Sequence, residues 1–201
     1  MNHCDLCKEV GLEFLRPYQP AEFIEGKSNS NVWIVGLNPA ADIGWTDEER
    51  TAEDLSNAFN DTKTIHPYFK DFSKVSPRLF ELFGKENGVA HTDIVKCSSK
   101  SWPPETAKGK KTQFVIQNCK RYLFTQIEVH KPKMIICNGA PVSHQIKEVL
   151  PVEKQITETA YESRIQGQKI IVVLSGFIGR IDDWSKRRLG YEIESLLDDM
   201  T

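Results

Sequence analysis

Short apolar strand signals alternate with longer amphipathic segments along most of this chain. The apolar, β-branched runs cover residues 32–37, 89–95, 133–137 and 169–174. Continuous runs of this kind are typical of strands buried on both faces, as in a parallel sheet. The alternation predicts an α/β fold, namely a three-layer α/β/α arrangement with a central parallel sheet of about four strands.

The segments between these runs are expected to form helices, hairpin turns or loops. Helical periodicity predicts helices over residues 69–84, 111–129 and 140–150, and a last helix that begins near Asp182. Residues 155–174 are expected to form a hairpin, and residues 98–110 a polar surface loop. Since the 201 residues contain no linker or repeat, we expect one domain that spans residues 1–201.

Composition limits the class of protein. No apolar run approaches the roughly 18 residues that a membrane span needs, and the N-terminus does not resemble a signal peptide. The five cysteines are an odd number, which argues against a secreted disulfide framework and for a cytoplasmic protein with reduced thiols. The net charge of −2 argues against a polycationic DNA binder, but it allows an enzyme that holds DNA locally. We expect a monomer.

Four of the cysteines are candidate metal ligands. Cys4 and Cys7 form a C-x-x-C pair, and Cys97 and Cys119 lie far downstream. Four thiolates can hold zinc or an iron–sulfur cluster, and such a site would fasten the N-terminus to the body of the domain. Alternatively, Cys97 and Cys119 are ordinary buried cysteines. Cys137 lies within a strand-like run and is expected in the core.

Three further motifs end or follow the predicted strands, where ligands bind in parallel sheets. They are Gly36-Leu37-Asn38-Pro39-Ala40, Thr92-Asp93-Ile94-Val95-Lys96-Cys97, and the late loop over residues 174–180. Together with the order of the cysteines, they resemble the uracil-DNA glycosylase superfamily, and in particular its iron–sulfur branch. The chain is a divergent member by this resemblance. Asp93 stands where the family usually has Asn, the late loop lacks the family's His, and Asn38 stands where iron–sulfur relatives often have Ala.

The resemblance implies a base-excision glycosylase that hydrolyses the N-glycosidic bond of a damaged or deaminated base in DNA, uracil or a related one. Such an enzyme takes the base out of the stack into a pocket. By resemblance, Asn38 is the catalytic residue that positions the water. The base would be bound by Leu37, by the stacking ring of Tyr68 and by Asp93. Cys4, Cys7, Cys97 and Cys119 would hold a 4Fe–4S cluster, with zinc as the alternative.

Each of these residues also has a simpler interpretation. Asn38 precedes Pro39, which is common turn chemistry; Tyr68 could be an ordinary core or surface residue, with Phe69 as the stacking ring; and Asp93 could be a structural residue at a strand end. The candidate DNA contacts are Ser175, Arg180, Lys108, Lys110 and Lys111. They could instead be solvated surface side chains.

The departures from the family pattern leave two alternative functions. The missing late His and the presence of Asp93 are also compatible with a non-catalytic nucleic-acid-binding or damage-sensing module of the same fold. A zinc-stapled α/β protein of unrelated function is the third possibility.

Overall fold

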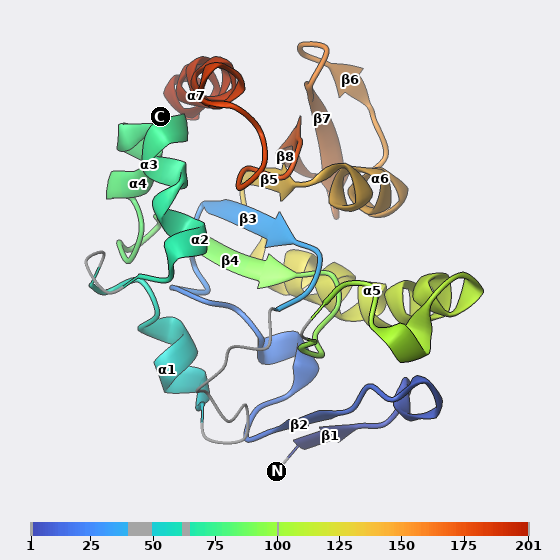
Figure 1. Ribbon diagram of the computed structural model, residues 1–201. Coiled ribbons are helices and arrows are strands. Elements are labelled where there is room, and N and C mark those ends of the chain that lie inside the picture. The colour runs from blue at the N-terminus through green and yellow to red at the C-terminus, as the bar shows by residue number, and fades with distance from the viewer. Residues whose placement is uncertain (1, 40–49, 62–64, 100, 201) are drawn as a thin grey trace.

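A central mixed sheet organises the molecule (Figure 1). The computed structural model describes residues 2–39, 50–61, 65–99 and 101–200. In spatial order the strands of the sheet are β4 (Val89–Asp93), β3 (Val32–Gly36), β5 (Met134–Asn138), β8 (Gln168–Ser175), β7 (Ala160–Ile165) and β6 (Lys154–Gln155). The first four are parallel to one another, whereas β7 and β6 run antiparallel to their neighbours.

The expectation of a parallel sheet of about four strands is therefore wrong in strand number and in direction. The predicted hairpin is present, and it explains the difference. Its second arm, β8, pairs with β5 on one side and with β7 on the other. The two-residue turn at Gln166 and Gly167, both with positive φ, forces β7 to run antiparallel. The first arm of the hairpin, β7, and the short strand β6 that pairs with it extend the four parallel strands by two.

The two faces of the sheet support two separate apolar cores, as a three-layer arrangement requires. Every residue of β3 is buried, and alternate side chains pack on opposite faces. Val32 and Ile34 belong to one core, whereas Trp33 and Val35 belong to the other. The prediction of a strand buried on both faces is confirmed here.

Helices cover both faces (Figure 1). One core includes residues of α5 (Lys110–His130) and α6 (Ala140–Val149), and the other includes residues of α7 (Asp183–Asp198). These three helices confirm the periodicity predictions. Asp182 caps α7, because its Oδ1 accepts hydrogen bonds from the backbone N–H groups of Trp184 and Ser185 at 2.8 and 3.0 Å. A short helix, α1 (Ala52–Ser56), contributes Leu55 to the first core.

The single helix predicted over residues 69–84 is wrong, because three short helices occupy this stretch. They are α2 (Pro67–Lys70), α3 (Phe72–Val75) and α4 (Pro77–Glu81). Pro77 disfavours helical backbone at Ser76, which is extended, and Ser76 Oγ instead caps α4 by accepting from Leu79 N at 3.0 Å. The break lets α7 approach closely, since a β-carbon on Gly190 would lie 1.8 Å from the Val75 carbonyl oxygen.

The N-terminus forms a small antiparallel hairpin that the sequence patterns do not predict. It consists of β1 (Asn2–Cys4) and β2 (Phe14–Arg16), with a 3₁₀ turn, η1 (Lys8–Val10), between them. Two further 3₁₀ turns are η2 (Pro20–Glu22) and η3 (Glu105–Ala107). The hairpin is held against the body of the domain. Asn118 of α5 donates to the Leu6 carbonyl at 3.1 Å, and the Thr106 hydroxyl donates to the Val10 carbonyl at 2.6 Å. Among the described residues, no helix combines the length and apolarity that crossing a membrane needs.

Candidate active site

The loops after β3 and β4 run side by side beyond the carboxyl ends of these strands. The backbone N–H groups of Ile94 and Val95 donate to the carbonyls of Gly36 and Leu37 at 3.0 and 2.9 Å. Because these bonds continue the pairing of the strands, the first predicted motif lies directly beside the second. Ala40, the last residue of the first motif, lies outside the described residues.

Asn38 is half-buried in this paired loop, and its side chain is anchored by its nitrogen. Its Nδ2 donates to Ser99 Oγ at 3.1 Å and to the Pro39 carbonyl at 2.9 Å. The contact with Ser99 joins the two strand-end loops, so it does more than form a local turn. Since the amide nitrogen is occupied in this way, its carbonyl oxygen is the atom suited to accept a hydrogen bond from a water.

Asp93, the last residue of β4, lies against the backbone of Gly36. A β-carbon on Gly36 would stand 2.2 Å from Asp93 Oδ1, so this close approach requires glycine at position 36. The Asp93 side chain is buried. Burial raises the pKa of Asp93 to about 6, although the neighbouring charge of His91 opposes this shift. The raised pKa makes the protonated form of this carboxyl group, which both donates and accepts hydrogen bonds, more accessible than in an ordinary Asp.

A buried charged group that the sequence patterns missed adjoins Asp93. His91 Nδ1 lies 2.8 Å from Glu25 Oε2, and Glu25 Oε1 lies 2.9 Å from Arg50. His91 Nε2 lies 3.8 Å from Asp93 Oδ1. The position of His91 two residues before Asp93 places both side chains on one face of a strand, and this was the available signal. No sequence pattern points to Glu25.

Tyr68 lies beside this group and is tied to the end of a third strand. Asn138, the last residue of β5, donates through Nδ2 to the Tyr68 hydroxyl and accepts through Oδ1 from Ile178 N at 2.8 Å. The Tyr68 ring lies 5.7 Å from the His91 ring and 6.0 Å from the Phe177 ring. The structure thus brings Tyr68 to the predicted site. Asn138 was missed, although it ends a strand at this same edge of the sheet.

The late loop exposes an aromatic ring with a cation above it. Arg180 is exposed, and its guanidinium carbon lies 5.8 Å from the centroid of the Phe177 ring, which is 41% exposed. Ser175 is half-buried, and its hydroxyl is directed to the carbonyls of Cys137 and Gly176 at 2.7 and 2.9 Å. Of the two predicted DNA contacts in this loop, Arg180 is therefore the more accessible.

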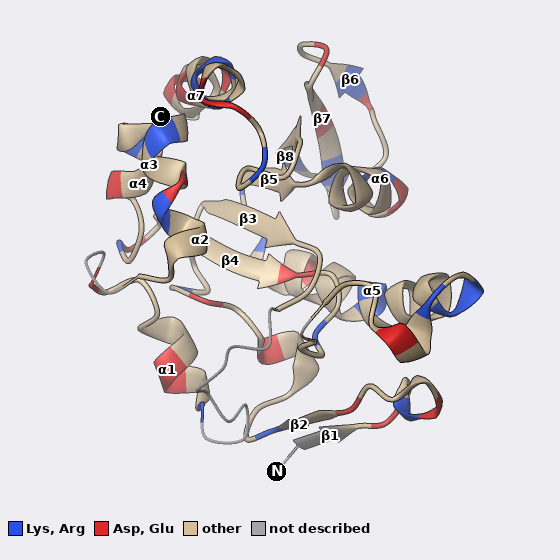
Figure 2. Cartoon of the chain, viewed as in Figure 1, with Lys and Arg blue, Asp and Glu red and all other residues tan. Residues whose placement is uncertain are grey.

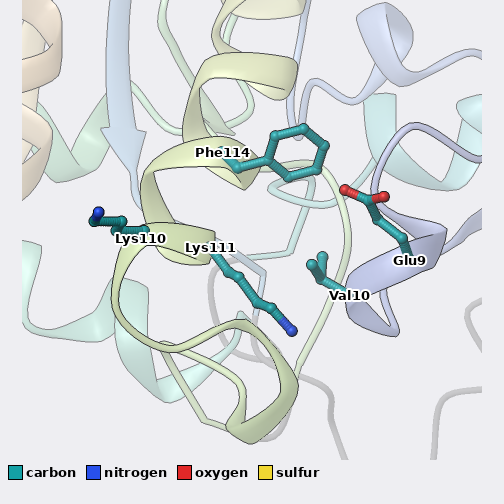
Figure 3. Close-up of a pocket in the computed structure, with 5 residues that line it drawn as sticks. All are labelled: Glu9, Val10, Lys110, Lys111 and Phe114. Carbon is teal, nitrogen blue, oxygen red and sulfur yellow. The ribbon is translucent and has the colours of Figure 1, made fainter.

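The three predicted DNA-binding lysines, Lys108, Lys110 and Lys111, are exposed around the start of α5 (Figure 2). Lys108 pairs with Glu105 at 2.7 Å. A hollow of about 340 Å³ lies between η1 and the start of α5 (Figure 3). It is lined by Glu9, Val10, Lys110, Lys111 and Phe114. In Figure 3 the side chains of Lys110 and Lys111 extend in different directions, so the positive charge is spread over this turn.

The predicted metal ligands lie on the N-terminal hairpin, on the loop after β4 and on α5. Cys7 and Cys119 are buried, and a hydrogen bond from Cys119 lowers the pKa of Cys7 to about 6. Cys97 is also buried, and Cys4 Sγ lies 3.3 Å from the Tyr122 hydroxyl. The donor chemistry suits zinc or iron–sulfur. Within the described ranges, however, no three His, Cys, Asp or Glu side chains are grouped as ligands of one metal ion.

Comparison with known families agrees with the geometry. A search of curated proteins finds no match. The family model described as the uracil DNA glycosylase superfamily matches residues 23–188. This range includes Asn38, Tyr68, Asp93 and the late loop, but it begins after Cys4 and Cys7. Because the match covers most of the 201 residues, the chain belongs to the uracil-DNA glycosylase superfamily.

Proposed function

We propose that this protein is a DNA glycosylase that hydrolyses the N-glycosidic bond of a damaged or deaminated base, uracil or a related one. The main support is the pairing of the two strand-end loops that carry Asn38 and Asp93. The side chain of Asn38 is fixed through Ser99, and that of Asp93 is fixed against Gly36. The paired loops thereby fix the side chain that would position the water and the side chain that would bind the base, as catalysis by positioning requires.

The groups around this frame are suited to hold a base outside the duplex. Tyr68 supplies the stacking face, and its hydroxyl is held by Asn138. Stacking of a base on an aromatic ring contributes roughly 1–3 kcal/mol. Asp93 contacts the edge of the base, and the backbone N–H groups near Leu37 and Asn38 donate to it. The Asn38 carbonyl oxygen orients the attacking water.

Stabilisation of the departing base is the weaker part of this site. The late loop, Leu174–Arg180, contains no His. Removing one donor to a developing anion typically costs on the order of 2.7–4 kcal/mol of transition-state stabilisation. We therefore expect slow base release, with Arg180 and Ser175 holding the DNA backbone rather than the leaving group.

The four cysteines form the structural part of the proposal. Cys4, Cys7, Cys97 and Cys119 would hold a 4Fe–4S cluster, with zinc as the alternative. The group would take no part in bond breaking. It would fasten the N-terminal hairpin to α5 and set the position of the loop that carries Lys108, Lys110 and Lys111, which would contact DNA phosphates.

A damage-sensing protein without hydrolysis is the second candidate, and the missing late His favours it. Release of base from oligonucleotides that contain uracil, hypoxanthine, xanthine or mismatched thymine separates the two. Release of any of these bases above the rate of the undamaged duplex supports the glycosylase. Tight binding of a damaged oligonucleotide without release of any base would support the sensor and contradict our proposal.

A further inference from the structure

Three buried titratable side chains form a connected row that the proposed hydrolysis does not fully use. Glu25, His91 and Asp93 are 9%, 4% and 4% exposed. Reciprocal backbone hydrogen bonds of 2.8 Å between Glu25 and His91 hold the first two side by side. The His91 ring is then clamped through Nδ1 by Glu25, whose other oxygen meets Arg50.

The other nitrogen of His91 is the unusual atom. His91 Nε2 is buried and has no hydrogen-bond partner among the described residues. It faces Asp93 Oδ1 at 3.8 Å, and both atoms point to the side of Gly36 where a β-carbon would lie, at 3.1 and 2.2 Å from that position. Burying a nitrogen without a hydrogen-bond partner costs free energy of folding. A function of His91 Nε2 in the site would account for this cost.

We propose that His91, clamped by Glu25, is a positioning residue that shares one proton with Asp93 and so decides which base edge Asp93 can read. This inference rests on the proposed glycosylase function and concerns how Asp93 in that same site reads a base. The edge in question pairs a ring N–H with an adjacent carbonyl oxygen. Uracil, hypoxanthine and xanthine, the products of deamination, all present this edge.

The proton balance is simple. When the proton leaves His91 Nε2 for the Asp93 carboxylate, the imidazolium becomes neutral, the carboxylate becomes a carboxylic acid, and Glu25 stays ionised. The net charge of the three groups is unchanged, and Nε2 and Oδ1 would close from 3.8 Å to hydrogen-bond distance as the proton passes. A protonated Asp93 offers one oxygen to the ring N–H and one O–H to the carbonyl, as an Asn would. An ionised Asp93 accepts from the N–H but repels the carbonyl oxygen.

The surroundings of the pair favour a shared proton. The other groups that act on it are Arg16, Glu25, Lys96 and the Tyr68 hydroxyl. Burial raises the pKa of Asp93 to about 6. Burial works to lower the pKa of His91, but the charge of Asp93 and the hydrogen bond to Glu25 raise it above its ordinary value. The pKa of each group is therefore raised, and each depends on the charge of the other.

The first test is the pH profile of uracil release in the wild type and in His91→Gln, whose amide retains a hydrogen bond to Glu25. Uracil release by the wild type should fall as pH rises through the titration of Asp93. Without the imidazolium, the ionised carboxylate is less favoured, so the midpoint should move up by roughly one pH unit. Asp93→Asn should release uracil at a rate independent of pH over this range, with or without His91→Gln. An unmoved midpoint in His91→Gln would overturn the proposal.

A second test does not depend on catalysis. The imidazole of His91 is titrated by NMR in the free wild-type protein and in Asp93→Asn. Removing the carboxylate should lower the pKa of His91, because the Asp93 charge raises it in the wild type. Identical titrations in the two proteins would refute the shared proton. If the wild type releases no base at any pH, the glycosylase proposal fails, and this titration still decides whether His91 and Asp93 are coupled.

Discussion

The carboxyl group of Asp93 occupies the space that a side chain at Gly36 would need, because a β-carbon there would lie 2.2 Å from Asp93 Oδ1. The two residues face each other in the register of β3 and β4. This contact places the end of β3 against the carboxyl group that we propose reads the base, and it gives the first prediction.

Gly36→Ala should displace the Asp93 carboxyl group and strongly reduce base release. We expect the free energy of unfolding to fall by about 1–3 kcal/mol, the usual cost of overpacking a dense interior. Urea denaturation of Gly36→Ala, Asp93→Ala and the double variant measures the coupling. The double variant should be less destabilised than the sum of the single variants. Simple additivity would show that the two side chains do not compete for this space.

Glu25→Gln should remove a pH-dependent part of the stability. Burial works to raise the pKa of Glu25, but the hydrogen bond and charge of His91, together with Arg50, lower it from 4.5 to about 2. A carboxyl group with a lowered folded-state pKa stabilises the protein fully above its unfolded pKa. This contribution, on the order of 3 kcal/mol, is lost as pH falls from about 4.5 through about 2.

Thermal denaturation between about pH 2 and about pH 7 checks this prediction. Glu25→Gln should be less stable than the wild type at neutral pH and should approach it at the acid end. Glu158→Gln, in an exposed segment, serves as the control and should follow the wild-type curve. A constant stability difference at every pH would contradict the predicted pKa.

Some helices and strands could be predicted from the sequence, and others could not. The run at Val32–Gly36 was predictable as a strand because burial on both faces leaves no polar position in it. The split at Ser76 was missed, although Pro77 was the available signal. The six-stranded sheet was missed because β8 serves both as a hairpin arm and as a parallel strand, and pairing of this kind depends on tertiary contacts.

The residues of the candidate site also differ in whether the sequence alone could indicate them. Asn38 and Asp93 could be singled out as candidates because they occupy motifs at strand ends. Glu25 was not, because only a long-range backbone bridge to His91 brings it to the site. The space that Gly36 leaves for Asp93 depends on strand register, which periodicity alone does not determine.

Replacing Lys108, Lys110 and Lys111 by Ala should weaken DNA binding to a similar extent for all sequences. Phosphate contacts release counterions, so the slope of log affinity against log salt should decrease by up to about 3. Fluorescence anisotropy at several salt concentrations measures both effects. The matched control replaces three exposed lysines on other elements, Lys70, Lys85 and Lys154. Equal losses in the two triple variants would show that the start of α5 is not the DNA contact.

Protein purified without oxygen should be brown and contain about four irons per chain if the cluster proposal is correct. Cys4→Ser and Cys119→Ser should lose the iron and loosen the N-terminal hairpin, which limited proteolysis detects. Cys137→Ser is the matched control, because Cys137 is a buried thiol within β5 and should retain the iron. Loss of iron in Cys137→Ser alone would refute the proposed ligands, and a colourless protein with stoichiometric zinc would favour the alternative metal.

The most direct test of the proposed function compares single-turnover base release and DNA binding in the wild type and in Asn38→Ala. The Asn38 side chain is assigned to the water and not to the DNA, so its loss should affect the bond-breaking step alone. We predict slow release of a deaminated base by the wild type, loss of most of that release in Asn38→Ala, and equal affinity of both proteins for the damaged oligonucleotide. Fast release of uracil that is undiminished in Asn38→Ala would contradict the account.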